Sequence, residues 1–80
     1  MRIEWEDGAK ASFRRYLRDQ QGMRAVLAAV DALAGDPLPE PPLGFHRGIY
    51  HRLHIGPYRV IYYVDGDVVT IRRVDRVAEP

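Results

Sequence analysis

Apolar and polar residues alternate at two different periods along this chain, and the change of period divides it into two halves. Residues 1–6 alternate with a period of two, which places Ile3 and Trp5 on one side and predicts a short strand. Two stretches then carry apolar residues at helical spacing. These residues are Ala9, Phe13, Tyr16 and Leu17, followed by Met23, Val26, Leu27, Val30, Leu33 and Ala34. The pattern predicts two amphipathic helices, with a break at Gly22 and a stop at Gly35.

The second half has the period and composition of β-structure. A connector with four prolines in residues 37–42 precedes three segments rich in β-branched and aromatic residues, at 49–55, 58–64 and 68–74. Gly56-Pro57 separates the first two segments and Asp65-Gly66-Asp67 the last two, and Asp-Gly between strands favours a hairpin. We therefore predict one α+β domain over residues 1–80 with the order β-α-α-β-β-β. Its helical hairpin should pack on one face of a mostly antiparallel four-stranded sheet.

Length and composition exclude several classes of protein. Eighty residues allow one small core, and the absence of cysteine excludes disulfides and thiolate metal sites. No apolar run approaches the ~20 residues that a membrane span needs, and the first residues lack the pattern of a signal peptide. We expect a cytoplasmic protein that uses no cofactor.

Charge is distributed unevenly, although the net charge is only +1. Seven of the eleven acids lie at or before Glu40, and residues 44–64 contain none. That acid-free segment holds Arg47, Arg52 and Arg59 together with His46, His51 and His54. A local basic stripe indicates a polyanion or an acidic protein segment as partner, and the alternative is a solvated arginine-rich surface.

The alternation of each strand predicts which residues share the face that the helices leave open. Because side chains alternate between the two faces, the apolar positions Leu53, Val60 and Ile71 assign their neighbours to the open side. The residues so assigned are Tyr50, Arg52 and His54, then Arg59, Ile61 and Tyr63, then Thr70, Arg72 and Arg76. In the last strand Val68 and Val74 favour the opposite parity. The predicted face suits phosphate groups, which arginine forks bind, and bases, which stack on aromatic rings.

The remaining candidate residues favour structural roles. His51 and His54 are three residues apart, so a strand directs them to opposite faces and they cannot chelate one ion together. We expect no metal site. Trp5, Phe13 and Met23 are expected to belong to the core.

The meander residues closely resemble the RelE/ParE family of bacterial type II toxins. The string Gly56-Pro57-Tyr58-Arg59-Val60-Ile61-Tyr62 is similar to the family's Gly-x-Tyr-Arg-Val-x-Tyr, and the basic residue and leucine that end its preceding strand match Arg52-Leu53. Residues 73–77 resemble the family's Arg-Val-Gly-His-Arg, and residues 18–24 resemble its actinobacterial branch. The resemblance covers nearly the whole chain and includes the predicted order of elements.

This resemblance implies a toxin that a cognate antitoxin holds inactive. RelE-type members cut mRNA in the ribosomal A site, so the ribosome and mRNA are the expected partners, whereas ParE-type members poison DNA gyrase. By similarity Arg52 would contact the scissile phosphate, Arg59 is the arginine of the Tyr-Arg string, and Arg76 is the basic residue of the last strand. These three and His54 are the predicted catalytic residues. The predicted substrate-binding residues are Tyr50, Tyr63, Arg72 and Arg47.

The C-terminal residues depart from the family pattern. RNA-cleaving members commonly carry a tyrosine or histidine after the last strand, where this sequence has Ala78-Glu79-Pro80, and Asp75-Arg76-Val77 replaces Gly-His-Arg. Cleavage by a 2′-hydroxyl needs a base, an acid and stabilisation of the charged phosphorane, and arginines supply only the last. His54 is the base available beside Arg52, with Tyr50 or Tyr63 to assist. The alternatives are a gyrase poison and a non-catalytic protein that keeps only its antitoxin contact.

Overall fold

The chain folds as two helices around a four-stranded sheet. The computed structural model describes residues 1–38 and 50–77. Its elements are β1 (Arg2–Trp5), α1 (Asp7–Arg15), α2 (Gln20–Ala32), β2 (Tyr50–Ile55), β3 (Tyr58–Asp65) and β4 (Val68–Arg76). The predicted α+β class and the order β-α-α-β-β-β are confirmed. The predicted substrate-binding residue Arg47 lies outside the described residues.

The sheet has the strand order β1-β4-β3-β2. Its last three strands form an antiparallel meander with two-residue turns, in which Gly56 and Gly66 take the positive φ values of 56° and 61° that favour glycine. Strand β1 pairs with β4 in parallel, from Arg2 beside Val68 to Trp5 beside Ile71. The Glu6 N–H then donates to the Ile71 carbonyl at 3.0 Å, which brings the residue after β1 against the middle of β4.

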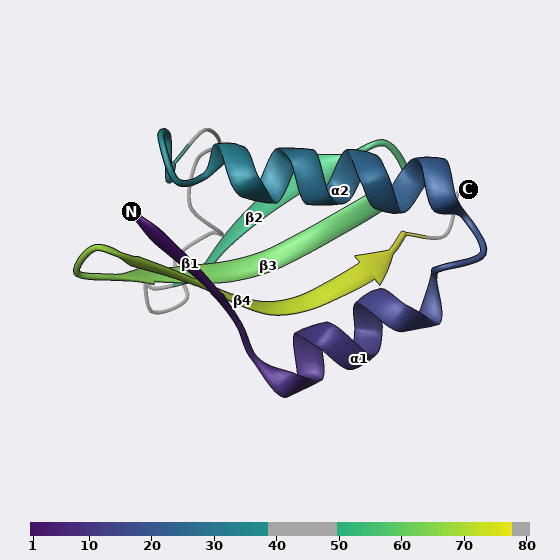
Figure 1. Ribbon diagram of the computed structural model, residues 1–80, viewed down its shortest axis with the longest axis horizontal. Helices are drawn as coiled ribbons and strands as arrows, with labels where there is room; N and C mark the ends of the chain where they lie inside the picture. Colours follow the sequence, from purple (N-terminus) through teal and green to yellow (C-terminus); the bar gives the residue numbers. More distant parts are fainter. Residues whose placement is uncertain (39–49, 78–80) are drawn as a thin grey trace.

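The two helices cover different parts of the sheet (Figure 1). Helix α2 lies across β2 and β3, whereas α1 runs along the part of β4 that β1 has left unpaired. There the Ser12 hydroxyl accepts a hydrogen bond from the Val74 N–H at 2.9 Å and donates to the Ala9 carbonyl at 3.0 Å. Helix α1 therefore completes the edge of the sheet with a side chain, and it diverges from α2. No helix in the described ranges is long and apolar enough to cross a membrane.

The core lies between the sheet and the inner sides of both helices. Its buried residues are Ala9, Met23, Val26, Val30, Leu33, Leu53, Tyr58, Val60, Tyr62, Val69, Ile71 and Val74. Met23 is 2% exposed, as predicted for a core residue. Trp5 and Phe13 only pack against the core from its margin, with their rings 5.6 Å apart.

The break between the helices lies at residues 16–19, and the predicted break at Gly22 is wrong. Gly22 lies inside α2. Only a glycine fits at this position, because a Cβ would lie 2.7 Å from Tyr58 Cε2. Asp19 caps the helix, accepting from the Gly22 N–H at 2.9 Å and from the Tyr58 hydroxyl at 2.7 Å. The hydrogen bond from Tyr58 lowers the pKa of Asp19, and the same bond raises the pKa of Tyr58. One carboxylate thus joins the start of α2 to the sheet.

A β-bulge interrupts β4. Tyr62 pairs with Ile71 and the adjacent Ile61 pairs with Arg73, so Arg72 has no residue opposite it. An extra residue in one strand shifts the alternation of faces beyond it. This is why both Ile71 and Val74 are fully buried although they are three positions apart in the strand. The sequence of this strand supports two opposite assignments of its residues to the sheet faces. The bulge explains both, because one assignment holds before it and the other after it.

Candidate functional site

The meander presents cross-strand rows of side chains on its open face, which is the side of the sheet away from α2. One row joins His54 to Arg59 and Arg59 to Asp75 across three strands. The next row joins Arg52, Ile61 and Arg73 in the same way. The structure therefore brings the predicted residues Arg52, His54 and Arg59 together on one face. His51 pairs with Tyr62 on the opposite face, as its spacing from His54 predicts.

Arg59 occupies the middle of this face. It lies between His54 on β2 and Asp75 on β4. Its Nε is buried and has no hydrogen-bond partner among the residues that the structure describes. A buried donor that lacks a partner is rare in folded proteins and costs free energy. Arg59 therefore combines a buried donor that no described residue satisfies with a central position between His54 and Asp75.

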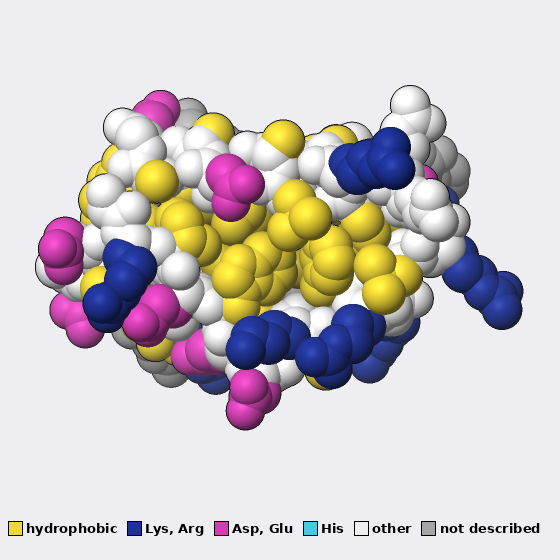
Figure 2. Space-filling view, viewed as in Figure 1, with side chains coloured by type: hydrophobic (Ala, Val, Ile, Leu, Met, Phe, Trp, Pro, Cys, Tyr) yellow, Lys and Arg dark blue, Asp and Glu magenta, His cyan; other side chains and the backbone are white. Residues whose placement is uncertain are grey.

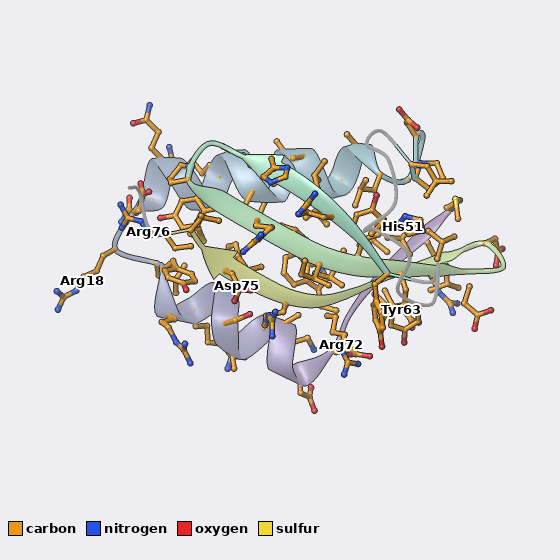
Figure 3. All side chains as sticks on the ribbon, turned by 180° about the vertical axis from the view of Figure 1, so that it is seen from behind. Arg18, His51, Tyr63, Arg72, Asp75 and Arg76 are labelled. Carbon is orange, nitrogen blue, oxygen red and sulfur yellow. The ribbon has the colours of Figure 1, made fainter. Side chains whose placement is uncertain are left out.

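An aromatic cluster lies at one end of the open face (Figure 3). The rings of Tyr50 and Tyr63 meet edge to face with centroids 5.8 Å apart, and the guanidinium carbon of Arg72 lies 5.4 Å from the Tyr50 centroid. Cation–π contacts of this kind attract a guanidinium group to the face of a ring. The structure thus brings together three of the predicted substrate-binding residues, Tyr50, Tyr63 and Arg72.

Glu6 organises this cluster, and the sequence did not indicate it. Its Oε2 accepts from the Tyr63 hydroxyl at 3.2 Å, and its Oε1 lies 3.5 Å from Arg72 Nη1. These partners are 57 and 66 residues away in sequence. Glu6 lies at the open face because β1 pairs with β4 in parallel. No local sequence pattern indicates that pairing.

The bulge changes which basic residues of β4 reach the open face. Arg76 pairs with the buried Tyr58, and its guanidinium carbon lies 5.9 Å from the Tyr58 centroid. The backbone N–H of Arg76 donates to the Tyr16 hydroxyl at 3.3 Å. The prediction that Arg76 points to the open face is therefore wrong, and Figure 3 shows Arg76 at the far end of β4. Arg73 and Asp75 take the open positions instead, joined by an Nε–Oδ2 contact of 2.8 Å.

The charged pairs on this face leave its arginines only partly neutralised. Glu6 and Asp75 each face one arginine, and both ion pairs are substantially exposed to solvent. Exposed pairs of this kind contribute little stability, so a ligand can replace one partner at small cost. Among the described residues no group of three His, Cys, Asp or Glu could hold a metal ion.

A second surface lies on the other side of the molecule, between the two helices. We call it the interhelical groove. It consists of two adjoining cavities of about 290 and 380 Å³. Its apolar lining is formed by Trp5, Phe13, Leu17, Met23 and Leu27, and its rim carries Lys10, Arg14 and Arg24. Figure 2 shows apolar side chains filling the space between the helices, with Lys and Arg along the α1 side.

The groove exposes apolar surface that a monomer usually covers. Leu17 and Leu27 both line the groove, with 48% and 40% of their surface exposed. Trp5 and Phe13, predicted as core residues, form its wall. A contiguous apolar surface with a polar rim is typical of a protein–protein contact site.

Comparison with known proteins identifies the family. Residues 3–79 match the family model of the ParE toxin of type II toxin–antitoxin systems, parDE. The chain belongs to this toxin family. The predicted membership of the RelE/ParE group is thereby confirmed, and the chain is a toxin of a type II toxin–antitoxin system. A search of curated proteins found no match.

Solved structures show the same fold at low sequence identity. The Mycobacterium tuberculosis RelBE2 toxin–antitoxin complex contains a chain with a TM-score of 0.82 and 23% identity, and the match covers 94% of this toxin and 95% of that chain. The isolated Escherichia coli RelE toxin gives a TM-score of 0.83 at 14% identity, with 99% and 86% covered. The chromosomal ParDE system of P. aeruginosa gives a TM-score of 0.75 at 18% identity, with 98% and 97% covered. These similarities show the fold, and they include both RelE and ParE proteins.

Proposed function

We propose that this toxin is a ribosome-dependent endoribonuclease that cleaves mRNA on its open face. The observation that carries the proposal is the position of Arg59 at the centre of this face, where its Nε has no hydrogen-bond partner among the described residues. Arg52 and His54 share its face. Two guanidinium groups beside an imidazole match what in-line attack by a 2′-hydroxyl requires, because the phosphorane gains negative charge while a proton must be removed.

The proposed reaction uses three kinds of group. His54 accepts the proton of the 2′-hydroxyl, and the oxygen attacks the adjacent phosphorus. Arg52 and Arg59 bind the phosphorane oxygens, and the bond to the 5′ oxygen breaks to leave a cyclic phosphate. The departing 5′ oxygen needs a proton, which we assign to the hydroxyl of Tyr50, because the hydroxyl of Tyr63 is already bound to Glu6.

The test is cleavage of mRNA by the purified toxin on programmed ribosomes, read by primer extension. We expect cuts within the A-site codon, a 2′,3′-cyclic phosphate at the new 3′ end, and little cutting of the same RNA without ribosomes. The domain is too small to hold a long RNA by itself, which is why we expect the ribosome to supply the mRNA in the right position. Intact mRNA at high toxin concentration would contradict the proposal.

A gyrase poison is the second candidate function. Two observations favour it: the matching family model is that of the ParE toxin, and Arg76 does not reach the open face. A toxin of this kind would arrest growth and block DNA supercoiling by gyrase while mRNA stays intact. A supercoiling assay run beside the cleavage assay separates the two.

We also propose that the antitoxin inhibits this toxin by placing an amphipathic segment in the interhelical groove. The apolar lining requires an apolar stripe, and the basic rim formed by Lys10, Arg14 and Arg24 requires acidic residues beside that stripe. Crosslinking from position 17 to the antitoxin tests this placement. Efficient crosslinking only from open-face positions would contradict it.

A further inference from the structure

A cavity of about 540 Å³ lies between α1 and the open face. Gly8 and Ala11 of α1 form one wall, and Tyr50 and Ile61 of the sheet form the other. We call it the α1 pocket. It exists because the Ser12–Val74 hydrogen bond holds α1 at the edge of β4, where the helix rises beside the open face. Small residues on that wall leave room for a flat group.

Charged groups surround this space at both ends. The Arg72–Glu6 pair closes one end, the Arg73–Asp75 pair closes the other, and α1 adds Arg15. Carboxylates only accept hydrogen bonds and guanidinium groups only donate them. The pocket therefore offers donors and acceptors together around two apolar walls and an aromatic ring.

This combination fits one chemical class better than a simple anion. Phosphate only accepts hydrogen bonds at its ionised oxygens, and the two carboxylates would repel it. A nucleobase carries donors and acceptors on its edge and has two apolar faces that stack on aromatic rings. The volume lies within the range of about 300–1,000 Å³ that is usual for pockets that bind small ligands.

We propose that the α1 pocket binds a nucleobase of the RNA strand. In this arrangement the base lies between Ala11 and Ile61 with its edge toward Glu6 or Asp75, and Arg15 contacts the phosphate of the same nucleotide. The proposal rests on the proposed function, since it makes RNA the ligand. It adds that α1, which carries none of the predicted catalytic residues, reads a base next to the cleavage site.

The first test is an NMR titration of the isotope-labelled full chain with adenosine 5′-monophosphate, ribose 5-phosphate and inorganic phosphate. We expect adenosine monophosphate to shift the amide signals of Gly8, Ala11 and Ile61, and we expect ribose 5-phosphate and phosphate to shift them at least tenfold less at equal concentration. Equal shifts with all three probes would show a site for phosphate alone and overturn the proposal, as would adenosine monophosphate shifts confined to other parts of the chain.

The second test fills the pocket without removing any charged group. Ala11 is exposed on α1, so Ala11→Leu should fold normally and weaken adenosine monophosphate binding at least tenfold. Ala25→Leu, at an exposed position of α2 outside this pocket, is the matched control and should bind like wild type. Unchanged binding by Ala11→Leu, with melting temperatures equal to wild type, would overturn the proposal.

Cleavage assays on the same proteins separate this inference from the proposed function. A wild-type chain that binds adenosine monophosphate in the pocket but never cuts mRNA contradicts the nuclease and supports the ligand class of the pocket. If Ala11→Leu cuts mRNA at the same codons and the same rate as wild type, the nuclease stands and the pocket proposal fails.

Discussion

The open face and the interhelical groove lie on opposite sides of one small sheet and present different chemistry. On the open face, charged groups are held by partners inside the fold: Glu6 binds Tyr63 and faces Arg72, and Arg73 binds Asp75. The groove instead exposes apolar side chains such as Leu17 and Leu27. Charged and hydrogen-bonding groups suit a polar ligand that can exchange hydrogen bonds with them. Exposed apolar surface suits a partner large enough to exclude water from it.

This difference suggests a division of roles between the two surfaces. A partner in the groove need not touch Arg52, Arg59 or His54, because the sheet separates them from it. The toxin could therefore lose activity without losing its antitoxin, and the reverse. The following variants test that separation.

The largest effect is expected from His54→Ala. Loss of a general base typically costs about 10²–10⁴ in rate, so cleavage on ribosomes should disappear, whereas antitoxin affinity should stay near that of wild type. His51→Ala, three residues away on the opposite face, is the control and should still cut. Full cleavage by His54→Ala would show that His54 is not the general base, which would then be Tyr50, Tyr63 or a residue after β4.

Arg59→Ala should reduce cleavage about 100-fold or more, because one donor to the charged transition state is lost. The melting temperature should stay close to that of wild type, because Arg59 is not a core residue and the donor that is lost has no partner among the described residues. Arg18→Ala, an exposed arginine between the helices, should leave cleavage unchanged. A melting temperature of Arg59→Ala far below that of wild type would assign Arg59 a structural role.

Leu27→Asp tests the groove. Loss of a central apolar contact typically costs about 2 kcal/mol of binding free energy, so antitoxin affinity should fall about 30-fold or more, measured by calorimetry. Growth arrest in the absence of antitoxin should persist. Leu38→Asp provides the control, since Leu38 is 55% exposed and does not line the groove. Unchanged affinity of Leu27→Asp would place the antitoxin on the open face instead.

The smallest effect concerns the carboxylate that joins α2 to the sheet. Its hydrogen bonds with Tyr58 and Gly22 lower the pKa of Asp19 in the folded state. A lowered folded-state pKa contributes stability above the unfolded pKa of about 3.9, and that contribution is lost as the pH falls further. Asp19→Asn should therefore melt a few degrees below wild type at pH 7, and the difference should shrink below pH 4. An equal difference in melting temperature at pH 7 and pH 2.5 would show that the ionised Asp19 carboxylate does not cause it.

Much of the fold was predictable from local pattern. The two periods of apolar residues indicated all six elements, and Asp65-Gly66 indicated the last hairpin. Alternation in β2 and β3 placed Arg52, His54 and Arg59 on one face, because both strands pair without interruption. Where a strand is regular, a period of two is sufficient to assign faces.

The predictions that are wrong concern residues whose placement depends on contacts between distant parts of the chain. Arg76 was misplaced because the bulge at Arg72 shifts the parity of β4, although the spacing Ile71-Arg72-Arg73-Val74 could have indicated it. A glycine within a helical pattern predicts a break, and only tertiary packing reveals that the proximity of Tyr58 requires a glycine at position 22.

By itself the sequence determined the elements, the turns and the three central residues of the open face, since these follow from interactions within a few residues of the chain. Only the tertiary structure decided that Glu6 holds Arg72, that α1 forms a wall beside the open face, and that two diverging helices leave an apolar groove. Each of these depends on the parallel pairing of β1 with β4, which fixes where α1 starts. That pairing joins residues more than 60 positions apart, and no local periodicity encodes it.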